Sequence, residues 1–103
     1  MFRRQRFGDV IDRQLELFRR EQAGLLGEID AAEDRYDRAD RDEAEELYGD
    51  YQDLVETGTE ILADLRDHFA SSLGEQAAEQ YEAEFNDAVR TDLPRFGLEI
   101  ENR

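Results

Sequence analysis

Apolar residues recur along the first third of the chain at alternating spacings of four and three residues. These positions are Ile11, Leu15, Phe18, Gln22, Leu25, Ile29, Ala32, Tyr36 and Ala39, and all but Gln22 are apolar. This heptad spacing is typical of a helix that packs along one stripe against another helix, as in a coiled coil. The pattern therefore predicts a long helix over residues 8–39. It leaves open whether Gly24 and Gly27 kink that helix, and whether Gln22 is buried or reaches solvent.

A second stripe of the same spacing predicts a helix over residues 42–72. Its positions are Ala44, Tyr48, Tyr51, Val55, Gly58, Leu62, Leu65, Phe69 and Ser72, and Leu47, Leu54, Ile61 and His68 form a neighbouring row. Two adjacent rows widen the apolar face, so this helix is expected to lie at the centre of the fold. Whether it kinks at Gly58 stays open.

The two stripes do not belong to one continuous helix. If the first register continued, its apolar positions would be occupied by Glu43, Glu46, Asp50 and Asp53. The apolar stripe instead shifts by about 140° around the helix, at about 100° per residue. This change of phase predicts a chain reversal at residues 40–42 and hence an antiparallel helical hairpin.

A third, shorter helix is predicted over residues 74–92. Its apolar face consists of Ala77, Ala78, Tyr81, Phe85, Ala88 and Val89. Ser72 and Glu75 have the spacing of a capping box, and Pro94 ends the helix. Residues 95–103 alternate Phe96, Leu98 and Ile100 with other residues, which predicts an extended tail. The expected fold is a single all-α domain, residues 1–103, built as a three-helix bundle.

The lengths of these helices predict a homodimer. At about 1.5 Å per residue the third helix is about 28 Å long, whereas each arm of the hairpin is about 45 Å long. The far end of the hairpin is therefore expected to stay uncovered, and large exposed apolar patches usually mark interfaces. The predicted dimer interface consists of Ile29, Tyr36, Leu47, Tyr48, Tyr51 and Leu54.

The charge of the chain indicates the ionic strength at which this fold is expected to be stable. The 103 residues include 28 acidic and 13 basic ones, all 13 of them Arg, so the net charge is −15. Repulsion of this kind is screened at about 1 M salt, where the Debye length is roughly 3 Å. The composition resembles that of cytosolic proteins of halophilic archaea; an acidic protein of a GC-rich bacterium is the alternative. There is no Cys, signal peptide or membrane span, which predicts a soluble cytoplasmic protein without disulfides.

The N-terminal end departs from the acidic character of the rest. Residues 1–20 contain six Arg and three acidic residues, whereas residues 21–103 contain seven Arg and 25 acidic residues. The candidate partner-binding arm consists of Phe2, Arg3, Arg4, Arg6 and Phe7. Interleaved aromatic and Arg side chains suit docking on the acidic surface of the chain's own dimer, or a partner protein. They also suit contact with nucleic acid or a membrane, which we consider the less favoured alternative.

Candidate chemistry is sparse. Asp64 and His68 lie one helical turn apart, the spacing of two metal ligands, but the repeated Glu-x-x-His motif of di-iron bundles is missing. A histidine at the edge of the bundle with one hydrogen bond is the favoured interpretation, and a metal-binding bundle is the alternative. No nucleophile–base pair, phosphate loop or cofactor motif is present. The sequence therefore predicts a non-enzymatic, homodimeric helical interaction module without cofactors; a small nucleic-acid-associated regulator using the basic arm is the other hypothesis.

Overall fold

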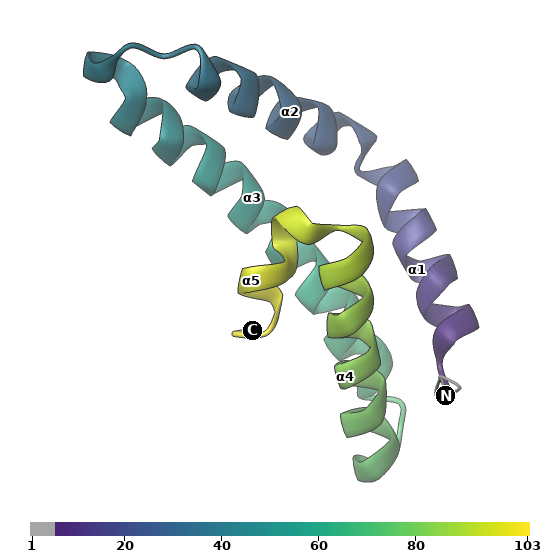
Figure 1. Cartoon of the computed structure of the whole chain (residues 1–103). Coiled ribbons are helices and arrows are strands. Elements are labelled where there is room, and N and C mark those ends of the chain that lie inside the picture. The colour runs from purple at the N-terminus through teal and green to yellow at the C-terminus, as the bar shows by residue number, and fades with distance from the viewer. Residues whose placement is uncertain (1–5) are drawn as a thin grey trace, which may run out of the picture.

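The computed structural model describes residues 6–103, and over that range the protein is all-helical, which confirms the predicted class. The elements are α1 (Gly8–Glu21), α2 (Ala23–Asp37), α3 (Arg41–Ala70), α4 (Glu75–Asp92), the 3-10 turn η1 (Pro94–Phe96) and α5 (Gly97–Ile100). Figure 1 shows α2 and α3 side by side and antiparallel, with α4 and α5 against the lower part of α3.

The predicted single helix over residues 8–39 is wrong, because the chain bends at Gln22. With φ −106° and ψ 24°, this residue leaves the helical conformation. Its N–H still donates to the Phe18 carbonyl at 2.8 Å, and its carbonyl accepts from the Leu26 N–H at 2.9 Å, so few hydrogen bonds are lost. The bend lets α1 pack on α4 while α2 packs on α3. The half-buried Gln22, rather than Gly24 or Gly27, marks the break.

The central helix α3 runs without interruption through Gly58. A Cβ atom placed there would lie 2.5 Å from Cε1 of Phe96, which is too close for a real contact. Glycine is therefore needed in mid-helix because the Phe96 ring packs directly on the backbone. The neighbouring Thr59 is completely buried and satisfies its hydroxyl by donating to the Val55 carbonyl at 2.8 Å.

The core lies in the lower half of the molecule, between α1, the second half of α3 and α4. Its largest buried side chains include Tyr81, Phe85, Phe96 and Ile100. The Tyr81 hydroxyl donates to Gln14 Oε1 at 2.8 Å, which ties α4 to α1. Burial raises the pKa of Tyr81 to about 12.

The predicted extended tail is wrong, because residues 94–100 form η1 and α5. Phe96 and Ile100 lie four residues apart on one face of this segment and are buried, whereas Leu98 is 86% exposed. The segment is held by the buried Arg66, whose guanidinium donates to the Ile100 carbonyl and to Asn86 Oδ1, each at 3.0 Å. A helical turn places Phe96 and Ile100 together against α3 and α4 and leaves Leu98 exposed, whereas an extended arm would put all three side chains on one face.

The ends of the helices also differ from the predicted caps. The N-cap of α4 is Gly74, without a side-chain hydrogen bond, and the Ser72 hydroxyl donates instead to the Phe69 carbonyl at 2.7 Å. At the start of α1 the carboxylate of Glu84, a residue of α4, accepts the backbone N–H groups of Arg6 and Phe7 at 3.3 and 2.8 Å. A cap supplied by another helix cannot be read from local sequence.

Candidate functional site

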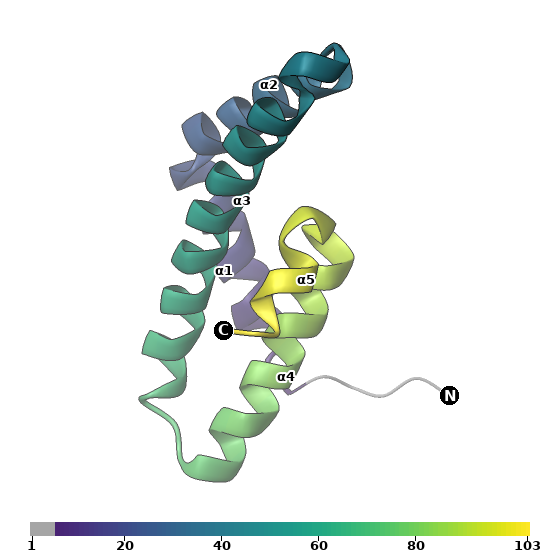
Figure 2. The same ribbon diagram turned by 90° about the vertical axis from the view of Figure 1, so that its left-hand side faces the viewer.

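The upper half of the hairpin projects beyond the rest of the molecule. Figure 2 shows α4, η1 and α5 on one side of the α2–α3 pair and below its upper end, and the longest dimension of the molecule is 50 Å. We call residues 32–54, from the second half of α2 to the first half of α3, the hairpin tip. Among the described residues its main contact is that between α2 and α3, and at its base Glu33 also pairs with Arg95 of η1 at 2.8 Å.

Aromatic and aliphatic side chains gather on the hairpin tip. The rings of Tyr36 and Tyr48 pack with their centroids 5.2 Å apart although they are 38% and 44% exposed, and the Tyr48 and Tyr51 centroids are 6.4 Å apart. The Gln52 amide donates to the Tyr48 hydroxyl. Leu47, Tyr51 and Leu54 are half-buried.

Ile29 differs from the other residues of the predicted interface. Its side chain is 0% exposed within its own chain, where it belongs to the hydrophobic core. We therefore leave Ile29 out and define the tip patch as Tyr36, Leu47, Tyr48, Tyr51 and Leu54. The five residues come from α2 and α3. The rings of Tyr36, Tyr48 and Tyr51 pack one on the next, whereas Tyr51 and Leu54 also pack against the core of their own chain.

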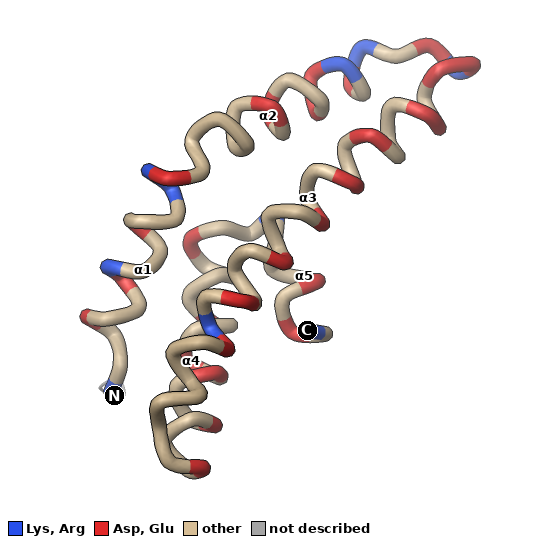
Figure 3. Tube along the Cα trace, turned by 180° about the vertical axis from the view of Figure 1, so that it is seen from behind, with Lys and Arg blue, Asp and Glu red and all other residues tan. Residues whose placement is uncertain are grey.

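Charge is divided unevenly between the two helices of the tip. Figure 3 shows basic residues toward the end of α2 and acidic residues along the first half of α3. Arg35 and Arg38 are exposed on α2, and Arg38 pairs with Asp34 at 3.2 Å. On α3, Glu46 and Asp50 are exposed. The tip thus combines an apolar patch with an acidic flank on α3 and a flank of mixed charge on α2, where Glu33, Asp34 and Asp37 accompany the two Arg.

The candidate N-terminal arm falls only partly within the structure, because Phe2, Arg3 and Arg4 lie outside the described residues. Arg6 is exposed, with its guanidinium 5.1 Å from the centre of the Phe7 ring. The Phe7 ring packs edge-on against Tyr81, with a centroid distance of 5.5 Å. The described end of the arm is therefore held by α4 of its own chain, through this ring contact and the Glu84 carboxylate.

Asp64 and His68 both lie exposed on α3. Among residues 6–103 no group of three or more His, Cys, Asp or Glu side chains is arranged to hold a metal ion. Asp64 and His68 thus offer two candidate metal ligands, and no third ligand lies beside them in the described part of the chain. No described helix is long and apolar enough to cross a membrane.

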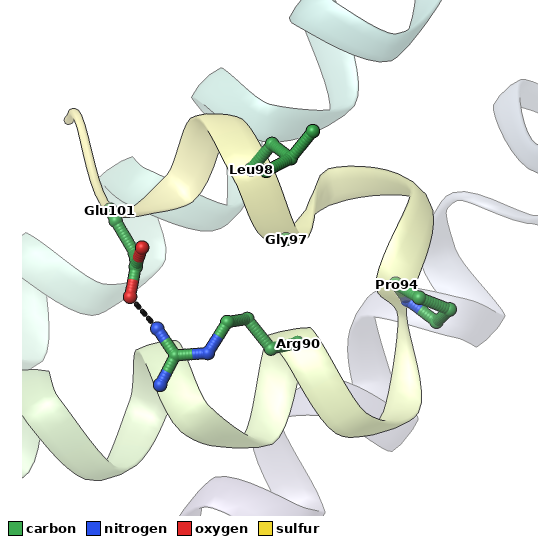
Figure 4. Close-up of a pocket in the computed structure, with 5 residues that line it drawn as sticks. All are labelled: Arg90, Pro94, Gly97, Leu98 and Glu101. Carbon is green, nitrogen blue, oxygen red and sulfur yellow. Dashed lines mark ion pairs between the residues drawn. The ribbon is translucent and has the colours of Figure 1, made fainter.

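Sequence reasoning missed two shallow hollows that lie on either side of Pro94. One is lined by Arg90, Pro94, Gly97, Leu98 and Glu101, shown in Figure 4, and the other by Leu26, Asp92, Leu93, Pro94, Arg95 and Phe96. In the first hollow Arg90 forms ion pairs with Glu101 and Asp87, so its charge is already satisfied. Gly97 allows this arrangement, because a Cβ there would lie 3.2 Å from Cα of Arg90.

Comparisons with protein families, curated proteins and solved structures find no match to this chain. Fold and surface together define a small acidic helical protein with a projecting hairpin.

Proposed function

We propose that this protein is a non-enzymatic helical interaction module that forms a homodimer through its hairpin tip. The observation that carries the proposal is the exposure of Tyr36 and Tyr48 at the end of the hairpin, above the reach of α4 and α5. Tyrosine is enriched at protein interfaces, where its ring supplies contact area and its hydroxyl a hydrogen bond. The tip patch therefore has the composition of a contact surface.

A second copy of the chain is the simplest occupant of this patch. Two paired helices form a layer with apolar side chains at its edges, and two such layers stacked face to face form a four-helix arrangement that covers them. A two-fold axis achieves this with one surface contacting itself, which makes dimers the commonest assemblies. Of the N-terminal arm only Arg6 and Phe7 are described, and the packing of Phe7 on Tyr81 favours docking of this end on its own chain.

The charge of the chain sets the conditions for this association. Each copy has a net charge of −15, so two copies repel at low ionic strength. At about 1 M salt the Debye length of roughly 3 Å screens most of that repulsion while apolar contacts persist. We propose that the module works in the salt-rich cytoplasm of a halophilic organism, for which its acidic, Lys-free composition is suited.

Light scattering across a KCl series tests the proposal. We expect a dimer of the 12.0 kDa chain whose fraction rises with KCl concentration. Tyr48→Glu, in the centre of the tip patch, should shift the equilibrium to monomer. Leu98→Glu is the matched control, because Leu98 is still more exposed but lies on α5, away from the tip. A monomer at every KCl concentration, or equal effects of both variants, contradicts the proposal.

A further inference from the structure

The exposed ring of Tyr48 lies on the side of the hairpin where α4 and α5 pack further down. Arg66 donates to the Ile100 carbonyl of α5 at 3.0 Å. Tyr48 precedes Arg66 by exactly five helical turns, at about 3.6 residues per turn, so both side chains leave α3 in nearly the same direction. Tyr36 packs on Tyr48 from α2. The side of the hairpin that α5 covers below therefore continues upward to the tyrosines of the tip patch.

The helix α2 contributes to the same side. Asp30 and Glu33 each pair with Arg95 of η1 at 2.8 Å. Asp37, one turn above Glu33, is exposed and forms no ion pair with another residue of 6–103. Both helices of the tip therefore share one side that lies above η1 and α5.

This side of the hairpin is covered only in its lower part. The first buried residue of α3 is Val55, so residues 41–54 lie above the covered part and span about 21 Å at 1.5 Å per residue. Figure 2 shows that α4, η1 and α5 stop below the upper end of the hairpin. Packed helices lie about 10 Å apart, so these elements project by about 10 Å and form a step below residues 41–54. The radius of gyration is 15.6 Å, larger than the roughly 13 Å of a compact chain of this length.

We infer that a second copy fills this step with the two hairpins antiparallel, so that each tip lies above the C-terminal segment of the other copy. This inference rests on the proposed homodimer and adds its contact face and orientation. A hairpin tip is one layer of helices, about 10 Å thick, which matches the projection of α4 and α5. The middle of residues 41–54 lies beside Tyr48, so a two-fold axis there brings the tip patches of both copies together.

The shape of the chain opposes the parallel alternative. A two-fold axis along the hairpins would set α4 and α5 of both copies against each other. Two layers of about 10 Å each would then hold the tip patches about 20 Å apart. Splayed hairpins would meet only at their extreme ends and would leave Gln52, nearer the step, outside the contact. Charge does not select the orientation, because acidic residues are exposed on each of the helices α1 to α4.

Distances between spin labels distinguish the two orientations. The chain has no Cys, so His68→Cys near the lower end of α3 supplies a single labelling site at an exposed position. In the antiparallel dimer the two labels should lie about 60 Å apart, because they are each about 20 residues from the axis at 1.5 Å per residue. In a parallel or splayed dimer they should lie within about 40 Å, since packed helices cross at about 50° or less. Asp40→Cys should give less than about 30 Å in either case and verifies that the tips meet.

Two substitutions of equal charge test the contact face. Gln52, whose amide donates to the Tyr48 hydroxyl, lies about 40° around α3 from Tyr48, whereas Thr57 is exposed about 180° away. Gln52→Glu places a charge within the contact and should weaken the dimer roughly tenfold, because the carboxylate loses water on association. Thr57→Glu adds the same charge outside the contact and should leave dimerisation unchanged. Light scattering at the KCl concentration where half of the wild type is dimeric measures both.

The outcomes separate the face and the orientation from the dimer itself. A dimer whose labels at position 68 lie within about 40 Å overturns the antiparallel arrangement. A dimer that Thr57→Glu weakens as much as Gln52→Glu, or that neither variant weakens, overturns the choice of face. These results leave the homodimer standing, whereas a chain that stays monomeric at every KCl concentration overturns both proposals.

Discussion

The two halves of this molecule have the same pattern of apolar residues and differ in what covers it. In the lower half, Phe96 and Ile100 from the C-terminal segment close over α3, and they are no more than 1% exposed. At the hairpin tip, Tyr36 and Tyr48 occupy equivalent stripe positions and are 38% and 44% exposed. An apolar stripe therefore marks a face that can be buried, and the length of the neighbouring elements decides where burial occurs.

The largest expected difference between the halves concerns side-chain truncation. Phe96→Ala removes a buried ring that packs on Gly58 and on Phe18, and should lower the free energy of unfolding by about 3–5 kcal/mol. Tyr48→Ala at the tip should lower that of the monomer by less than about 1 kcal/mol. Urea unfolding at protein concentrations below dimerisation measures both. Comparable losses would mean that the tip is as well packed as the lower half.

Alkaline pH should weaken the lower half selectively. The folded-state pKa of Tyr81 is about 12, above the ordinary 10.0, so the folded state favours the protonated phenol. The associated stability is complete below pH 10 and is lost as pH rises from 10 to 12, by up to about 1.4 kcal/mol per pH unit. Tyr81→Phe should remove this dependence and lower stability by about 1 kcal/mol at neutral pH, because the bond to Gln14 is lost.

Unfolding free energies measured across that pH range test the prediction. Tyr36→Phe, at an exposed ring of the tip, serves as the control and should leave the alkaline loss in place. An unchanged pH profile in Tyr81→Phe would show that the alkaline loss comes from another group.

Two glycines of α3 should respond in opposite directions to the same substitution. Gly58→Ala places a Cβ against the Phe96 ring and should destabilise the fold by about 1–3 kcal/mol. Gly49→Ala at the tip meets no atom within 4 Å and should stabilise it by about 0.5–1 kcal/mol through helix propensity. Thermal unfolding of the two variants compares them directly. Higher thermal stability in both variants would show that Phe96 does not pack on Gly58.

The smallest expected effect concerns the ion pairs that hold the C-terminal segment to α2. Burial lowers the pKa of Arg95, but its hydrogen bonds to Asp30 and Glu33 outweigh this and raise the pKa above its ordinary value. Arg95→Gln should reduce stability by less than about 1 kcal/mol, and less in concentrated KCl. Arg38→Gln breaks the more exposed ion pair with Asp34 and should reduce stability by less than Arg95→Gln does. Unfolding at low and high KCl tests this order.

The predicted dimer interface shows how much of a candidate site can be identified from the local sequence pattern. The stripe positions and the short third helix predict Tyr36 and Tyr48 as interface residues, and their rings pack with a centroid distance of 5.2 Å between α2 and α3. Ile29 satisfies the same pattern but is buried, because it lies where the hairpin enters the lower core. The exposed and the buried residues of this stripe differ only in their position along the hairpin. Whether a position is covered depends on where the C-terminal segment folds back.

The sequence by itself determined the helical class, the reversal near residue 40 and the end of α4 before Pro94, because periodicity, phase and proline act locally. The tertiary structure decided the rest. Phe96, Leu98 and Ile100 fit a period of two, yet Phe96 and Ile100 also fit a helical turn, and packing on Gly58 beside Arg66 selects the helix. Such long-range contacts have no local signature, because the residues that meet are separated by more than 30 positions along the chain.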